Sequence, residues 1–324
     1  MKVMLIATAS FALFVENMLG WGDQGHIAIW TVAQAQLTTK ARQQVTNILA
    51  GDKLAMTAVW LDRAREATQK GTGPLIGDPE AATFTNAFPS NPEWHFVNLP
   101  LAVSSYQDGA AFTSENDVVH RLNFCIEVLE NQNTHLSKRV ALRALIHLVG
   151  DIHQPLHCGT GYYDTNNLAH PVLHMDPGSA QPLRRNEDRG GNQLFFGPGK
   201  FDELHGLWDG NLVRIVAGDS GSYRELAEVL TDFIVNVNAD TSGDVHTWAE
   251  QWAEESVRLA KQAYTGLTFG TCTLRTKDVA KRGPIERIEI TLPPDYEQIQ
   301  AETVRVQLAK AAIRLGELLN KILK

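Results

Sequence analysis

The sequence contains few cysteines and no long hydrophobic segment. Three cysteines in 324 residues permit at most one disulfide, which excludes a disulfide-stapled scaffold, and no pair has the spacing of a zinc ribbon. The longest apolar stretch, from Val3 to Val15, is shorter than the roughly 20 residues that a membrane-spanning helix needs. We therefore expect the mature form to have no membrane contact.

Positive charge is also scarce. The chain has 29 lysines and arginines against 37 aspartates and glutamates, which gives a formal net charge of -8. This balance argues against a protein that binds nucleic acid through a broad basic face. Bound metal ions would nevertheless add positive charge locally.

The N-terminus has the features of a secretory signal peptide, because Lys2 precedes the apolar stretch and small and polar residues follow it. We predict that residues 1–20 are a signal peptide, that the protein is secreted or periplasmic, and that residues 21–324 form a single domain. The residues before Trp21 match the usual cleavage motif only loosely, so cleavage a few residues earlier is the alternative.

Helical periodicity dominates the rest of the chain. Apolar residues recur at helical spacing in six segments: Gly25 to Leu49, Val118 to Leu129, Val140 to Ile152, Tyr223 to Val237, His246 to Tyr264 and Glu297 to Leu323. Alternating strand patterns are found only at Arg287 to Leu292 and, more briefly, at Gln193 to Phe196. Residues 71–92, 159–199 and 281–295 are rich in glycine, proline and asparagine and are expected to be loops. We predict a mainly α fold, a compact multi-helix domain with long loops and at most a short β-hairpin.

One apolar helix carries an unusual set of polar residues. His147 and Asp151 are four positions apart, so they lie on one helical face within reach of one cation. Pro155 should end this helix and present His157 from the following turn. An unpaired carboxylate in so apolar a helix would be costly without a compensating cation.

Further candidate ligands are scattered along the chain. His205 and Asp209 form a second pair at a spacing of four, while Asp62, His95 and His26 are single candidates. Cleavage before Trp21 would leave a free α-amino group that, together with the carbonyl of Trp21, can chelate a metal. For each single histidine the alternative is a hydrogen-bonded core residue.

The order of these motifs resembles a known enzyme family. The motifs are Trp-Gly-x-x-Gly-His from Trp21, Trp-x-Asp-x-x-Arg, Trp-His-Phe, His-x-x-x-Asp-x-His-Gln-Pro-x-His, Arg-Gly-Gly-Asn and His-x-x-x-Asp. Together they resemble the zinc-dependent single-strand-specific nucleases and 3'-nucleotidases. The same superfamily includes the trinuclear-zinc phospholipases C.

The resemblance implies three Zn²⁺ ions and a ligand for every expected position. One ion would be held by Asp62, His95, His147 and Asp151, a second by His157, His205 and Asp209, and the third by the Trp21 amino nitrogen and carbonyl, His26 and the shared Asp151. Imidazole and carboxylate ligands without thiolates suit catalytic zinc.

The resemblance also implies a reaction. A hydroxide held between zinc ions would attack phosphorus in line, which leaves a 5'-phosphate and a free 3'-OH. Asp62 would orient or deprotonate the attacking water, and Arg65 would meet the charge on the phosphoryl oxygens, unless it forms only a salt bridge to Asp62. Substrate contacts would come from Gly190, Gly191, Asn192 and Asn211.

Single-stranded DNA and RNA and 3'-nucleotides are the expected substrates, and we expect a monomer. Stacking candidates for the bases are four aromatic residues in predicted loops, Phe84, Phe88, Tyr162 and Tyr163, and for each of them ordinary packing is the favoured alternative. Asn98 departs from the resemblance, because relatives often have an aspartate there.

Two other functions fit parts of the pattern. A phospholipase C would use the same metal ligands, although the Arg-Gly-Gly-Asn and Trp-x-Asp-x-x-Arg motifs favour a nuclease. A secreted zinc-binding protein without catalytic turnover is the third reading, and the mixed carboxylate set argues against it.

Overall fold

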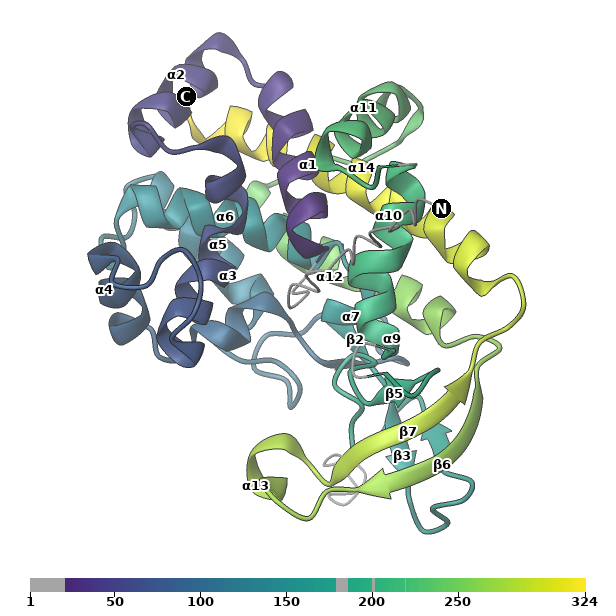
Figure 1. The fold of residues 1–324 in the computed structure, drawn as a ribbon. Coiled ribbons are helices and arrows are strands. Elements are labelled where there is room, and N and C mark those ends of the chain that lie inside the picture. Colours follow the sequence, from purple (N-terminus) through teal and green to yellow (C-terminus); the bar gives the residue numbers. More distant parts are fainter. Residues whose placement is uncertain (1–20, 179–185, 200–201, 219) are drawn as a thin grey trace, which may run out of the picture.

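The computed structural model describes residues 21–178, 186–199, 202–218 and 220–324. The predicted signal peptide, residues 1–20, lies outside the described residues. Helices make up most of the structure, so the predicted mainly α fold is confirmed (Figure 1). Within the described ranges, no helix is both long and apolar enough to cross a membrane.

The longest helix, α14 (Tyr296–Ile322), is a central support of the fold. Its buried residues include Val304, Leu308 and Leu315, which recur at helical spacing. It packs against α1 (Gly22–Ala35), α10 (Leu212–Ala217) and α11 (Tyr223–Phe233). Figure 1 shows α14 running behind these helices.

Helix α6 (Lys138–Ile152) lies at the centre of the core, and every residue from Val140 to Ile152 is buried. The Ser137 hydroxyl caps its N-terminus by accepting from the backbone N–H of Val140. Helices α3 (Leu54–Lys70) and α5 (Val118–Leu129) pack against it. A polar side chain on such a helix requires a partner, because no water is at hand to solvate it.

The chain turns sharply after α6. The short helix α7 (Pro155–Cys158) begins with proline, as predicted from Pro155, and Gln154 caps it. The remaining helical elements are α2 (Thr39–Leu49), α4 (Pro79–Ala87), η1 (Asn91–His95), α9 (Leu204–Gly206), the π-helical turn η2 (Leu207–Asn211), η3 (Ile234–Asn236), η4 (Val245–Thr247), α12 (Trp248–Ala263) and α13 (Val279–Arg282).

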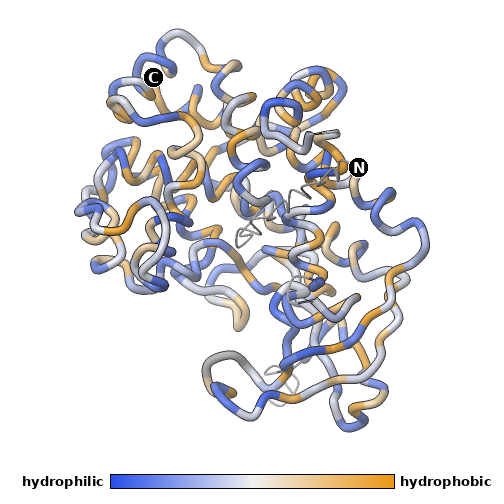
Figure 2. Tube along the Cα trace, viewed as in Figure 1, coloured by the Kyte–Doolittle hydropathy of each residue, from blue (hydrophilic) through white to orange (hydrophobic). Residues whose placement is uncertain are grey.

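Three small sheets complete the structure. Strand β1 (Leu99–Pro100) pairs in parallel with β2 (Gly159–Thr160), and β3 (Tyr162–Asp164) pairs antiparallel with β4 (Val172–His174). In the third sheet β7 (Ile285–Thr291) lies between β5 (Leu194–Phe195), which is parallel to it, and β6 (Thr268–Leu274), which is antiparallel. The long β6–β7 pair projects below the helices, and hydrophobic and hydrophilic residues alternate along it (Figures 1 and 2).

Some local predictions need correction. The segment from Gly25 to Leu49 forms two helices, because Thr38 caps the start of a new helix with its side chain. The predicted loop 71–92 contains α4, whose cap at Asp78 and proline at the first helical position form a strong start signal. The described sheets are more than a short hairpin, since the predicted loop 159–199 contributes four short strands, β2 to β5.

Candidate metal centre

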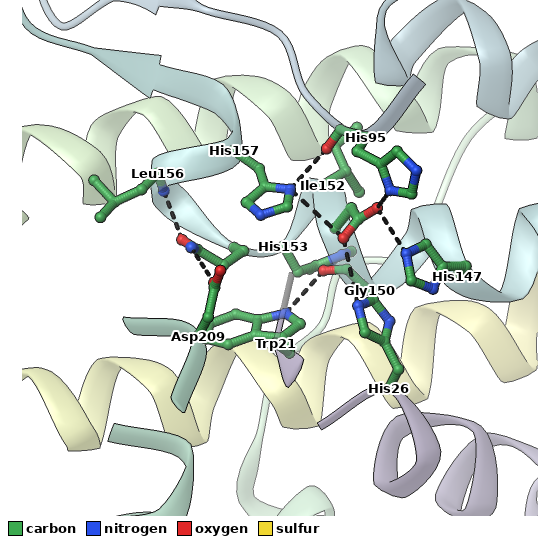
Figure 3. Close-up of polar contacts among 12 residues, drawn as sticks. Trp21, His26, His95, His147, Gly150, Ile152, His153, Leu156, His157 and Asp209 are labelled. Carbon is green, nitrogen blue, oxygen red and sulfur yellow. Dashed lines mark hydrogen bonds and ion pairs between the residues drawn. The ribbon is translucent and has the colours of Figure 1, made fainter. Parts of the chain in front are cut away.

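The predicted ligands converge where α6 and α7 meet α1, α3 and η1. Figure 3 shows the imidazoles of His26, His95, His147 and His157 gathered around one carboxylate. That carboxylate is Asp151, which is fully buried. Residues more than a hundred positions apart in the sequence therefore meet at one point.

The distances around Asp151 are short. Its Oδ2 lies 2.8 Å from His95 Nδ1 and 3.3 Å from His147 Nε2, and its Oδ1 lies 3.4 Å from His26 Nε2. Asp62 adds a second buried carboxylate, with Oδ2 3.5 Å from His147 Nε2. The ligand atoms form three compact groups, which are His26, His147 and Asp151; Asp62, His95 and His147; and His157, His205 and Asp209.

Three of the histidines are oriented by backbone carbonyls. Nδ1 of His147 hydrogen bonds to the carbonyl of Ala58 at 2.9 Å, and Nδ1 of His157 hydrogen bonds to that of His95 at 2.7 Å. His205 Nδ1 makes the same contact with the Gly190 carbonyl at 2.7 Å. In each case Nδ1 must carry the proton, so Nε2 keeps its lone pair for a metal.

Several buried polar atoms of this cluster have no hydrogen-bond partner within the described part of the chain. They are both ring nitrogens of His26, Nε2 of His95, His147 and His157, Oδ1 of Asp151 and Oδ2 of Asp209. Buried polar atoms normally have a hydrogen-bond partner, so this concentration of unpaired atoms indicates that the cluster binds a ligand. Imidazole and carboxylate donors without thiolates fit divalent zinc.

The electrostatics of the cluster favour a bound cation. Burial disfavours a charged imidazole, yet the carboxylates of Asp151 and Asp62 raise the pKa of His147 to about 9. Burial and the Arg65 guanidinium lower the pKa of His95 to about 4. Although burial opposes it, the neighbouring His147 holds the pKa of Asp151 well below its usual range. Two ionised carboxylates therefore share a buried site that needs positive charge.

Trp21 lies at the edge of this cluster. It is fully buried, and its indole N–H donates to the carbonyl of Gly150 at 2.8 Å, next to Asp151 (Figure 3). Its own carbonyl accepts from the backbone N–H of Gly25 at 3.2 Å. The backbone of Trp21 is thus held beside the predicted third ion site, and its proposed role as a terminal amino ligand stays a prediction.

Glycine is required at two positions for close packing. A Cβ on Gly150 would lie 2.6 Å from Nδ1 of His26, so the imidazole rests on this glycine. Gly190 has φ +63°, and a Cβ there would lie 2.0 Å from the carbonyl oxygen of Leu156.

Arg65 forms an ion pair with Asp62, with Nη2 2.9 Å from Oδ1. This ion pair is the alternative that the sequence offered to a role in substrate binding. Arg65 also lines a pocket of about 800 Å³ beside the cluster. The two roles are compatible, because one guanidinium offers five N–H groups.

The other predicted substrate residues lie in different places. Gly190 and Gly191 follow Asp188 in a buried loop, and Gly190 holds His205 through its carbonyl. Asn192 donates to the carbonyl of Arg189 at 2.8 Å, so its side chain supports the loop. Asn211 is exposed at the end of η2, and none of these four residues lines the 800 Å³ pocket.

Sequence reasoning missed Gln154, although it lies in the His-Gln-Pro motif. Its amide donates to Oδ1 of Asp209 at 2.7 Å, and its own oxygen accepts from the backbone N–H of Leu156 at 2.6 Å (Figure 3). The side chain is fully buried. It thereby connects the turn after α6 to η2, which carries Asp209. The spacing of His205 and Asp209 gave no signal for this link.

Aromatic residues divide between core and pocket. Phe84 and Tyr163 are buried in the core, and Phe88 packs against Trp94, so these three stacking candidates are core residues. Tyr162 lines the pocket, as do two phenylalanines that the sequence did not single out, Phe96 and Phe112.

Fold and site together define a helical protein with clustered imidazole and carboxylate groups that are suited to bind several divalent cations. The chain belongs to the S1/P1 nuclease family, whose sequence pattern matches residues 21–324. It is thus a nuclease, an enzyme that hydrolyses phosphodiester bonds.

Relatives match at low identity over most of the chain. Endonuclease 2 of Arabidopsis thaliana is 24% identical over 99% of this chain and 96% of its own length. Nuclease P1 of Penicillium citrinum is 23% identical over 93% of this chain and 97% of its own. Nuclease S1 of Aspergillus oryzae is 24% identical over 67% of this chain and 62% of its own.

Proposed function

We propose that this nuclease is a secreted or periplasmic enzyme with three Zn²⁺ ions that cleaves single-stranded DNA and RNA to 5'-nucleotides and removes phosphate from 3'-nucleotides. The observation that carries the proposal is the buried set of ligand atoms without partners around Asp151, next to a pocket that begins at Arg65. The three groups of ligand atoms in the structure support the proposal, since they contain the predicted ligands other than Trp21; His147 belongs to two of these groups, one with His26 and Asp151 and one with Asp62 and His95.

Bound zinc ions would supply Lewis acidity and a water of lowered pKa. Asp62, ionised because His147 and Arg65 hold its pKa down against the effect of burial, would accept a hydrogen bond from the attacking water and orient it. Arg65 would donate to the phosphoryl oxygens as their charge grows. The backbone carbonyls behind His147, His157 and His205 keep the imidazoles fixed during turnover.

The preference for unpaired strands follows from the pocket. Phe96 and Phe112 are partly exposed on the pocket and offer aromatic surface for a base, while Arg65, paired with Asp62 of the metal cluster, lies at the phosphate end. A base reaches such a pocket only when it is free of its duplex stack, and extracting it costs a few kcal/mol. Single strands and mononucleotides avoid that cost.

The test uses the purified secreted form with single-stranded DNA, duplex DNA, RNA, a 3'-nucleotide and phosphatidylcholine, each with and without a chelator. We expect hydrolysis of single strands and of the 3'-nucleotide that chelation abolishes and zinc restores. Hydrolysis of phosphatidylcholine alone would instead identify a phospholipase C. Zinc retention without hydrolysis of any substrate would indicate a binding protein.

A further inference from the structure

The pocket beside the metal cluster has a polar wall that the proposed reaction does not use. Glu187 and Asn98 lie on this wall, and the Asn98 amide donates to Oε2 of Glu187 at 3.4 Å. A backbone bridge between Glu187 and Tyr162 fixes the position of the glutamate. The ring of Tyr162 meets that of Phe112 edge-on, with centroids 5.9 Å apart, so the polar wall adjoins an aromatic one.

Glu187 is partly buried, and few of the described residues around it are charged. Asp188 and Arg189 follow it in the chain, and Asn98 faces it from the segment after η1. The other charged groups on the pocket are Arg65, Glu93 and Asp117. Burial first, and then the Asp188 carboxylate, raise the pKa of Glu187 to about 7, against the opposing effects of Arg189 and Asn98. Both protonation states are therefore populated near neutral pH.

The two states of this carboxyl group read different purine edges. An ionised carboxylate only accepts hydrogen bonds, so it suits guanine, whose Watson–Crick edge presents N1–H and N2–H₂ side by side. A protonated carboxyl group has one donor and one acceptor, so it suits adenine, whose edge presents N1 as acceptor and N6–H₂ as donor.

We propose that Glu187 determines the purine preference of the pocket, selecting guanine when ionised and adenine when protonated. The proposal rests on the proposed function, because it places the base of a 3'-nucleotide against this wall and its phosphate toward Arg65. Asn98 supports the glutamate by donating to Oε2, and because each carboxylate oxygen has two lone pairs, both oxygens keep capacity for the base.

The first experiment measures kcat/KM for 3'-GMP and 3'-AMP between about pH 5.5 and about pH 8.5, bracketing the titration. The ratio of the two values cancels any pH dependence of the reaction itself. We expect the GMP/AMP ratio to rise about tenfold across this range, the discrimination expected of one paired hydrogen-bond contact. A ratio that does not change with pH overturns the proposal.

Two variants separate Glu187 from general charge effects. Glu187→Gln has one donor and one acceptor at every pH, so its ratio should stay at the low, adenine-favouring value. Glu93→Gln removes the same charge from an exposed position on the same pocket, and its ratio should still rise with pH. A Glu187→Gln enzyme with a wild-type pH response overturns the proposal.

A binding measurement distinguishes this inference from the function on which it rests. Guanosine and adenosine carry no phosphate and so are not hydrolysed, and their binding to the purified metal-loaded protein by titration calorimetry reports the base pocket. If neither nucleotide is hydrolysed but guanosine affinity rises relative to adenosine with pH, the proposed function fails and the pocket assignment stands. If nucleotides are hydrolysed and the nucleosides show no such change, only the role of Glu187 fails.

Discussion

Replacing Gln154 with leucine should weaken zinc binding without touching a ligand. The leucine has a similar volume, but it removes the hydrogen bond to Oδ1 of Asp209 and the cap on the backbone N–H of Leu156. Gln154 is fully buried, so no water replaces the lost donor. A hydrogen bond to a charged group is worth about 1.5–3 kcal/mol, and loss of such an outer partner typically lowers metal affinity about 10–100-fold.

The assay compares zinc retention by wild type and Gln154→Leu in buffers of graded chelator strength, with metal content measured after dialysis. We expect the variant to lose the ion proposed for His157, His205 and Asp209 at a roughly 10–100-fold lower chelator activity. The remaining ions should be retained as in wild type, because Asp209 belongs to one ligand group only.

The control must separate metal binding from general destabilisation. Gln307 on α14 is also buried, and its side-chain amide donates a hydrogen bond to Oε1 of Glu255 on α12 at 3.1 Å. Gln307→Leu should lower the thermal stability of the zinc-free protein but leave zinc retention unchanged. Equal zinc retention by Gln154→Leu and wild type would refute the role of Gln154.

Three further changes probe the site and its support. Gly150→Ala should push the His26 imidazole aside, since the new Cβ would lie 2.6 Å from Nδ1, and metal analysis should show a deficit that normal zinc content would contradict. One extra residue retained before Trp21 should remove the amino ligand and cost a zinc ion, so unchanged metal content and activity would rule that ligand out. Glu255 is paired with Arg314 at 2.7 Å, and although burial opposes it, this pairing lowers the pKa of Glu255 to about 2. Because the folded pKa lies below the unfolded one, the stabilisation is full above about pH 4.5 and is lost as the pH falls toward 2. Glu255→Gln should therefore cost about 2 kcal/mol at neutral pH by urea unfolding, after allowance for solvent screening, and the difference from wild type should vanish in acid.

The sequence was most informative where local spacing decides geometry. His147 and Asp151 share a helical face because a spacing of four places them there, and Pro155 ends the helix regardless of tertiary context. The pair His205 and Asp209 also comes together, although η2 is a π-helical turn inserted after α9. An insertion of this kind shifts the helical register, and no pattern of residues in the sequence predicts the π-helical turn.

Contacts between distant segments could not be read in the same way. Gln154 carries no chemical signature of its own, and its role depends on where η2 docks. Glu187 looked like one charge in a polar loop, and only the fold shows that burial, against the opposing hydrogen bond from Asn98, raises its pKa. The break between α1 and α2 was missed because the apolar period continues across Thr38, where a side-chain cap overrides it.

The net charge of the chain fits a nuclease once the origin of its positive charge is considered. A broad basic face binds nucleic acid anywhere along a strand, whereas the described residues that line this pocket include two arginines, Arg65 and Arg189. The strongest positive charge would come from ions bound by Asp62, Asp151 and the surrounding imidazoles. Affinity for phosphate is then concentrated at the reacting position, which favours productive alignment over binding elsewhere on the surface.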